Sequence, residues 1–388
     1  MSDVSEEAQF EEFVGKLIQQ LSSDSDESIV RNGESLQVGI VTVNLRSNFK
    51  TFIKTPTELR HQCFQLIADV VSDGASAEEF TSFEEVRPRL RPKLWSRWTF
   101  ASLALESLAG GSKLESMPAR LLGEHVILSF VVDSPSSMRP VSLREFDCWG
   151  LAFDDVLRAA ADNLVENWQM LVSKSKDGGA LHCMMAADDN YDSSRFLCEE
   201  AFRDFGSDYP RWVFASSRDA CVVGRHDQLA AIVSMGLDLA KDDPKPLPPF
   251  PLIDNGDGWV GWFPDKEDPS FEKLVEEQQA YLMNMYAQQR ILLQRTATAR
   301  KDFSYVAEFK KLDDPNPVSS TLTHWNPGSE ILLPQADFVV FEEDPHPIAW
   351  DRVLDVCSDF LAPAEAIYPQ RWRTLGYPTK EQFNRMTG

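Results

Sequence analysis

The chain has 388 residues, of which 43% are apolar and 26% charged, and its formal net charge is −23. This composition is typical of a folded globular protein, and it excludes a disordered or fibrous chain. The length exceeds that at which one hydrophobic core usually stops growing, so it predicts two domains. The excess of acid argues against binding to nucleic acid or to an anionic membrane surface, because like charges repel.

Six scattered cysteines and the amino-terminal residues indicate a cytoplasmic protein. The cysteines lack the paired C-x-x-C spacing of a structural zinc site, and most lie among apolar residues. We therefore expect free thiols in a reducing compartment, with no metal and no cofactor. The first residues, MSDVSEEAQFEEF, are acidic where a secretory signal is basic, and no window holds about 18 uninterrupted apolar residues. We expect no membrane segment.

The first part of the chain predicts two helices that flank a hairpin. Apolar residues at three- and four-residue steps predict an amphipathic helix over residues 4–21. Asn32-Gly33 lies between β-rich runs and predicts a hairpin, since both residues tolerate positive φ. A second helix begins near Thr55-Pro56. Its expected buried stripe consists of Leu59, Cys63, Leu66, Ile67 and Val70.

The middle of the chain mixes strands and helices. The apolar run 125–133 predicts a buried strand, and the stripe over 153–172 predicts a helix. A further helix is expected after Asp192 or Ser193, either of which can serve as its N-cap. The runs WVFASS and CVVG, on either side of Arg218-Asp219, predict a hairpin, and a helix over 227–240 follows.

Prolines crowd residues 241–258, which we therefore expect to be a semi-rigid linker without helix or central strand. Beyond it we expect a long helix near 270–295, four strands within 303–342, a helix over 350–361 and an irregular tail. The order of elements predicts the α+β class, with mixed or antiparallel sheets packed against helices. The predicted domains are 1–243 and 259–388, joined by the linker 244–258.

Three stretches carry a resemblance by their order and spacing: SFVVDSPSSMRPVSLREFDCWGLAFDDVLRAAADNL (129–164), NYDSSRFL (190–197) and ASSRDACVVG (215–224). Together they resemble the YtpQ-like family of uncharacterised bacterial proteins, over about residues 30–240. The resemblance implies a cytosolic bacterial protein of mixed α/β structure. It assigns no catalytic residue, because no activity is established for the family, and it does not extend to the C-terminal third.

The charged residues Arg195, Arg218 and Asp219 are candidates for a binding site. Two guanidiniums that reach one pocket could clamp a carboxylate or phosphate through their planar forks. Alternatively, Arg218-Asp219 is a charged pair that fastens the hairpin. We favour the second interpretation, because a paired charge between elements requires no ligand.

The cluster GWVGWFP (258–264), just beyond the linker, is a candidate for contact with a protein partner at the junction near that linker. If Trp259 and Trp262 are exposed, they mark a recognition surface, and if they are buried, they seal a domain junction. The helix near 270–295 could also pair with a partner helix, but we expect it to pack on the strands that follow it.

The stretch RPRLRPKLWSRW (87–98) interrupts the acidic character of the chain. Its five basic residues alternate with Trp95 and Trp98, a pattern that suits phosphates and stacked bases. On a chain of this net charge, we instead expect residues 87–97 to form an extended arm that lies over an acidic body.

Asp265, Glu308 and Lys310 provide the enzymatic alternative. An acid followed later by E-x-K is typical of metal-dependent nucleases, in which carboxylates hold Mg²⁺ and the lysine stabilises charge. The sequence lacks other catalytic motifs, such as H-E-x-x-H, G-x-S-x-G or a phosphate-binding glycine loop. We therefore expect a non-enzymatic binding or regulatory protein with an unknown protein partner, and keep a metal-dependent hydrolase or nuclease as the alternative.

Overall fold

The structure is a computed structural model of the whole chain. It describes residues 6–24, 29–32, 35–38, 41–75, 80–110, 116–133, 138–174, 180–187, 189–205, 210–225, 228–241, 243, 246–300, 305–312, 320–328, 330–342 and 344–387. Gly33, Asp188 and Pro244 lie outside these ranges.

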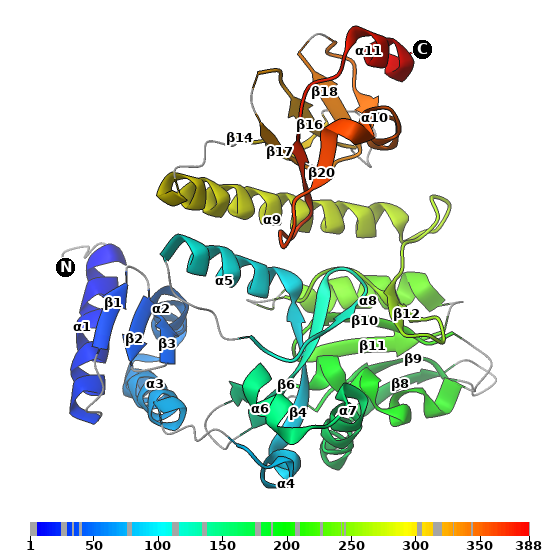
Figure 1. Ribbon diagram of the computed structural model, residues 1–388. Helices are drawn as coiled ribbons and strands as arrows, with labels where there is room; N and C mark the ends of the chain where they lie inside the picture. The colour runs from blue at the N-terminus through cyan, green and yellow to red at the C-terminus, as the bar shows by residue number, and fades with distance from the viewer. Residues whose placement is uncertain are drawn as a thin grey trace. The chain divides into compact units, whose positions relative to one another are not determined.

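Antiparallel and mixed sheets pack against helices, which confirms the predicted α+β class (Figure 1). The chain forms two compact units. Unit 1 consists of Met1–Arg91 and Phe130–Ala160, and unit 2 of Pro92–Ser129 and Ala161–Gly388. Two strands, β4 (Leu90–Ser96) and β6 (Val126–Asp133), contribute residues to both units.

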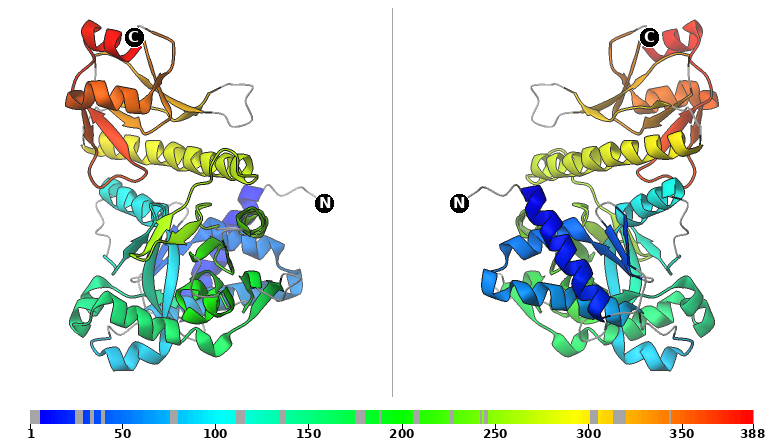
Figure 2. Two further views of the ribbon diagram at one scale, coloured as in Figure 1. Left: turned by 90° about the vertical axis from the view of Figure 1, so that its right-hand side faces the viewer. Right: turned by 90° about the vertical axis from the view of Figure 1, so that its left-hand side faces the viewer.

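The first part of unit 1 is a three-stranded antiparallel sheet with helices packed on it. Its strands are β1 (Ile29–Asn32), β2 (Ser35–Val38) and β3 (Val41–Asn44), and its helices are α1 (Glu6–Asp24), α2 (Leu45–Lys54), η1 (Thr57–Leu59) and α3 (Arg60–Ala75). The predicted first helix and the hairpin are confirmed, with Asn32 opposite Ser35. Figure 2 shows α1, in dark blue, running obliquely along this part. The apolar face of α1, which includes Phe10, Phe13 and Leu17, is buried.

The buried face of α3 differs from the predicted stripe. Of the expected core residues only Ile67 is buried, whereas Leu59, Leu66 and Val70 are exposed. The residues that contact the core are Phe64, Ile67, Ala68 and Val71. Two neighbouring stripes of α3 are apolar, and helical periodicity alone does not decide which of them faces the sheet.

The second part of unit 1 surrounds the carboxylate of Glu145. Its elements are α4 (Phe83–Val86), η2 (Arg87–Arg89), β7 (Met138–Pro140), α6 (Leu143–Trp149) and most of α7 (Phe153–Asp162). Arg139 donates two hydrogen bonds of 2.8 Å to Glu145, and Ser142 completes a capping box with the same carboxylate. Burial opposes ionisation, but these donors together with the N–H of Phe80 lower the pKa of Glu145 to about 2.

The predicted helix over 153–172 is wrong in its second half. The helix ends at Asp162, and η3 (Val165–Asn167) and the strand β8 (Met170–Lys174) follow. β8 pairs with β9 (Ala180–Met185) along its whole length, and this pairing overrides the helical spacing of the apolar residues. Leu171 is consequently 61% exposed on an edge strand.

Unit 2 is built on a six-stranded antiparallel sheet of order β13-β12-β10-β11-β9-β8. Its remaining strands are β10 (Trp212–Ser217), β11 (Ala220–Gly224), β12 (Leu252–Asp254) and β13 (Trp259–Gly261). Every residue of β10 and β11 is buried, so both faces of the central hairpin are covered. The covering elements are α8 (Leu229–Ala240), η4 (Asp192–Leu197) and η5 (Glu199–Phe205). The helix expected after Asp192 is therefore two 3₁₀ segments.

The proline-rich segment lies within unit 2. Leu252–Asp254, at its end, forms β12, which lies between β10 and β13, so the expectation of no central strand is wrong for these residues. The crowded prolines precede the strand, where a missing N–H removes no ladder hydrogen bond. The segment does not separate the two units found here, and the division of the chain at 244–258 stays a prediction.

A long helix and two four-stranded sheets complete unit 2. The predicted helix is α9 (Phe271–Arg300), which packs on α5 (Arg97–Gly110) and contacts the following sheets through Leu292 and Leu293 (Figure 1). One sheet contains β14 (Tyr305–Val306), β17 (Ile331–Pro334), β21 (Arg371–Thr374) and β20 (Leu361–Pro363). The other contains β15 (Lys310–Lys311), β16 (Thr321–Trp325), β18 (Phe338–Phe341) and β19 (Ile348–Ala349).

The C-terminal residues are more regular than the sequence predicts. After α10 (Trp350–Cys357) and η7 (Ser358–Phe360), the tail supplies two paired strands and the helix α11 (Lys380–Thr387). Its irregular appearance in the sequence comes from three prolines, of which Pro363 ends β20 and Pro369 and Pro378 lie between elements. Within the described ranges, none of the helices combines the length and apolar content that a membrane crossing requires.

Candidate binding site

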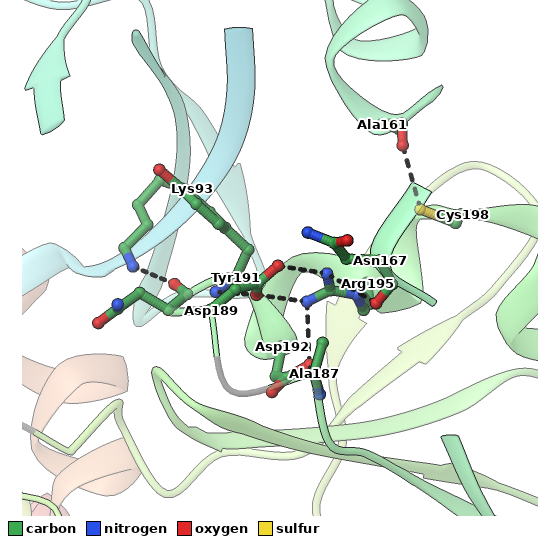
Figure 3. Close-up of polar contacts among 10 residues, drawn as sticks. Lys93, Ala161, Asn167, Ala187, Asp189, Tyr191, Asp192, Arg195 and Cys198 are labelled. Carbon is green, nitrogen blue, oxygen red and sulfur yellow. Dashed lines mark hydrogen bonds and ion pairs between the residues drawn. The ribbon is translucent and has the colours of Figure 1, made fainter. Parts of the chain in front are cut away.

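Arg195 lies at the centre of a buried ion cluster on η4 (Figure 3). Its side chain is 0% exposed. One terminal nitrogen, Nη1, donates to Asp189 Oδ1 at 2.7 Å and to Asp192 Oδ1 at 2.9 Å, and Nη2 donates to Asp189 Oδ2 at 2.6 Å. Asp192 in turn accepts a hydrogen bond from the N–H of Ala187. The two aspartates therefore hold both ends of the guanidinium fork.

The pKa values in this cluster follow from its geometry. Burial works to raise the pKa of Asp189, but the hydrogen bonds and charge of Arg195 outweigh it, so this pKa is lowered. Burial likewise works against the charge of Arg195, and the carboxylates outweigh it and raise its pKa. A guanidinium with both ends engaged by the protein's own carboxylates is not available to clamp an acidic ligand.

Arg218 and Asp219 form the turn between β10 and β11, as the sequence predicts. The ion pair of Arg218 is made with Asp243 rather than Asp219, at a distance of 4.0 Å. Asp243 Oδ2 also accepts hydrogen bonds from the Ser217 hydroxyl and from the N–H of Arg218. Asp243 therefore ties the turn to the chain that follows α8, and Arg195 and Arg218 use different carboxylates.

The two tryptophans line a cavity of about 530 Å³ in unit 2, which we call the aromatic cavity. Trp259 lies on the edge strand β13, and its ring makes an edge contact with Phe196 at 4.8 Å. Trp262 makes a similar contact with Trp212, and the neighbouring Phe263 is 57% exposed. Within the described residues, neither indole N–H of the cavity has a hydrogen-bond partner. The two tryptophans therefore pack against other aromatic rings, while their indole N–H groups remain available to a ligand.

The opposite wall of the aromatic cavity is the turn between β5 (Arg120–Leu122) and β6. The N–H of Gly123 donates to the carbonyl oxygen of Trp259 at 3.0 Å. Gly123 has φ +59°, and a Cβ at this position would lie 3.0 Å from the nitrogen of Gly261. Only glycine permits both this backbone conformation and this approach, so the turn sits directly against β13.

His125 is the one ionisable ring in the wall of the cavity. Its ring stacks on Phe250 with a centroid distance of 3.6 Å, and its Nδ1 is 2.6 Å from the hydroxyl of Tyr368. Burial, with a smaller contribution from the charge of Arg97, lowers the pKa of His125 to about 4. The imidazole is therefore neutral at pH 7 and contributes a flat surface to the wall.

Asp265, Glu308 and Lys310 do not assemble into a metal site. Glu308 forms ion pairs with Lys310, at 3.1 Å, and with Arg290. Asp265 is exposed and begins the turn that closes at Asp268. In the part of the chain that the structure describes, no group of three or more His, Cys, Asp or Glu residues is placed to hold a metal ion. The E-x-K pattern here is an ion pair between neighbours on the surface.

The basic stretch 87–97 is not an extended arm. It forms η2, β4 and the start of α5, and its residues are shared between the two units. Lys93 is buried, with its ammonium group hydrogen-bonded to the carbonyl oxygen of Asn190. Arg97 lies 4.4 Å over the ring of Tyr368. The basic groups are therefore distributed over three elements: Arg87 and Arg89 on η2, Arg91 and Lys93 on β4, and Arg97 on α5.

Several residues of these sites were not predicted from the sequence. The contact between Ser142 and Glu145 could have been found, because Ser142-x-x-Glu145 is a capping-box pattern. Asp243 and His125 carry no such local signal, since their partners are distant in the chain. His182 and Cys183 lie on β9, and burial raises the pKa of the Cys183 thiol to about 12, which leaves it protonated.

Comparisons of the chain with protein-family models, with curated protein sequences and with solved structures found no match. The resemblance to the YtpQ-like family stays a prediction. The function of this chain is therefore inferred from its own side chains. The aromatic cavity is a candidate binding site because four large aromatic side chains line it.

Proposed function

We propose that the chain is a non-enzymatic binding or regulatory protein of the bacterial cytoplasm, which acts through protein–protein contacts at the aromatic cavity. The observation that carries this proposal is the lining of the cavity. Aromatic side chains of Phe250, Trp259, Trp262 and Phe263 surround about 530 Å³. Cavities of this size and apolar character are typical of binding sites.

The rim of the cavity favours a protein partner over a small molecule. Leu121, Val260 and Phe263 all line the cavity and remain exposed at the surface. An apolar cavity that continues into an exposed apolar rim, with aromatic residues at its centre, is typical of interfaces. A small ligand would leave this rim in contact with water.

The free thiols support the cytoplasmic part of the proposal. All six cysteines are free, and four of them are buried. Protein thiols persist in a reducing compartment. The alternative of a metal-dependent hydrolase or nuclease has no comparable support, because Glu308 and Lys310 neutralise each other in an ion pair.

A selection from a random peptide library displayed on phage tests the proposal. We expect the full chain to enrich peptides that share apolar side chains, and we expect Phe263→Ser to abolish their binding. The matched control is Leu171→Ser, since Leu171 is similarly exposed, at 61% against 57%, but lies on β8. Each substitution should change the free energy of unfolding by about 0.5 kcal/mol or less. Peptides that bind both variants equally would refute the proposed site.

A further inference from the structure

A second cavity, of about 430 Å³, adjoins the aromatic cavity within unit 2. Phe250 and Phe263 line both cavities, so the two are neighbouring compartments that share a wall, and we call the pair the aromatic groove. The second compartment is lined by α9, through Gln278 and Leu282, and by residues that flank β18 and β19. Two compartments that share a wall suit a chain that presents two side chains in succession.

The ionisable groups of the aromatic groove are predominantly carboxylates. Its ionisable side chains, besides neutral His125, are the carboxylates Glu124, Asp337 and Asp351. Of the described residues that line the groove, none is Lys or Arg. Glu124 and Asp351 make no side-chain hydrogen bond or ion pair within the described residues. Their negative charge is therefore available to a ligand.

Gln278 adds an acceptor that is built into the groove. Its side chain is only 3% exposed, and its amide nitrogen is fixed by a hydrogen bond of 3.0 Å to the carbonyl oxygen of Pro249. This bond fixes the amide orientation, and within the described residues the Oε1 atom has no donor. Because Gln278 lines the second compartment, this oxygen can accept an N–H from a ligand.

The chain segment that carries the tryptophans of the groove is also negatively charged. Residues 254–268, which carry Trp259, Trp262 and Phe263, contain a single basic residue, Lys266. Their acidic residues are Asp254, Asp257, Asp265, Glu267 and Asp268. Such a field attracts cationic segments and repels anionic ones before contact is made.

We propose that the aromatic groove binds an extended, arginine-containing segment of a protein partner. This inference rests on the proposed function and adds the chemistry of the occupant. A guanidinium stacks on the face of an aromatic ring and donates several hydrogen bonds, so it suits both the indoles and the carboxylates. The free indole N–H groups of Trp259 and Trp262 suit the carbonyl oxygens of an extended backbone, as in grooves that bind polyproline segments.

Fluorescence anisotropy with labelled synthetic peptides tests the inference on the full chain. The first probe is a short peptide in which arginine alternates with proline and leucine. In the second probe glutamate replaces every arginine, and in the third serine replaces every leucine. We expect only the first probe to bind, and we expect its affinity to fall as salt is added, because exposed charge pairs are screened.

Substitution of the free carboxylates locates the contact. We expect the double variant Glu124→Gln, Asp351→Asn to weaken binding of the arginine probe roughly tenfold, as the loss of two partly exposed charge pairs implies. The matched control is Glu106→Gln, an exposed acid on α5 that lines neither compartment. This control should bind like the unsubstituted chain.

The possible results separate this inference from the proposed function. Equal or stronger binding of the glutamate probe would overturn the inference, whereas the proposed function would stand on the Phe263-dependent selection. Binding of the arginine probe that is unchanged in the double variant would also overturn it, because the charge would then act elsewhere. If none of the three probes binds but the phage selection succeeds, the inference is overturned, and the groove binds a segment of different chemistry.

Discussion

The Arg195 cluster and the aromatic groove lie in the same compact unit, but each reverses the usual distribution of side chains. In the cluster a cation and one carboxylate are buried, and a second carboxylate is partly buried. In the groove, aromatic and aliphatic side chains remain open to solvent. The charged residues that the sequence singles out, such as Arg195, do not mark an open binding site, because they pair with one another. Exposed apolar side chains around a cavity are the better indicator of such a site in this chain.

The two regions are also in direct contact. Phe196 belongs to the same 3₁₀ segment as Arg195, and its ring contacts Trp259 in the wall of the groove. The buried ions therefore hold a segment that supports the open site. Substitutions in the two regions should consequently affect the free energy of unfolding to very different extents.

The largest effect is expected for Arg195→Ala. This substitution removes the shared partner of Asp189 and Asp192 and leaves their charges buried or half-buried, so we expect a loss of about 3–5 kcal/mol in the free energy of unfolding. Urea denaturation measures it. Arg195→Lys serves as the control, since it retains the charge but not the bidentate fork, and should recover only part of the loss. A change below about 1 kcal/mol would contradict the role given to the cluster.

An intermediate effect is expected from His125 on acidification. Its pKa is near 4 in the folded chain and 6.5 in its ordinary state, so the unfolded chain binds more protons between these values. Stability should therefore fall as the pH decreases from about 6.5 to about 4, by at most about 3 kcal/mol from this residue. The measurement is denaturant unfolding across this range for the unsubstituted chain and for His125→Phe, which keeps an aromatic ring.

The difference between these two chains isolates the histidine from the carboxylates that titrate in the same range. If both lose the same stability, the pKa of His125 is not lowered in the folded chain. The aromatic groove would then gain a cation below about pH 6.5 rather than below about pH 4, and its preference for a basic segment would be lost on mild acidification.

The smallest effect concerns the turn of β10 and β11. Arg218→Ala should cost about 0.5 kcal/mol, because its ion pair with Asp243 is long and its side chain is one-third exposed. Asp243→Ala should cost about 1–2 kcal/mol, since it also removes the acceptor for Ser217 and for the N–H of Arg218. Thermal unfolding of the two variants checks the order. A larger effect for Arg218 would restore the interpretation in which that residue itself fastens the hairpin.

Local patterns predicted those parts of the fold that local interactions determine. Periodicity identified α1 and α9, a continuous apolar run identified β6, and two short runs on either side of Arg218-Asp219 identified the hairpin of β10 and β11. The pattern failed where long-range pairing decided the outcome, as in β8, where the pairing with β9 ended a helix that the spacing predicted. It also failed for α3, since two adjacent apolar stripes leave the choice of buried face to the rest of the chain.

The sequence predicted one wall of the candidate site but not the other. GWVGWFP stands out in any sequence as a dense group of large apolar residues, and it lines the groove. The opposite wall, from Gly123 to His125, comes from more than a hundred positions earlier and carries no motif. The carboxylates that distinguish the groove are ordinary surface acids by composition, and only their position beside the aromatic residues gives them meaning.

Gly123 has a consequence for the rate at which a partner can associate. The backbone of Gly123 is hydrogen-bonded to Trp259, and its missing Cβ lets the turn approach β13. The turn and β13 therefore cannot separate without breaking this hydrogen bond and this close contact. The groove is therefore already shaped before a partner arrives, and the entropy lost on binding falls on the incoming segment. Association should proceed in a single step whose rate rises linearly with concentration, without a slow rearrangement of the receptor.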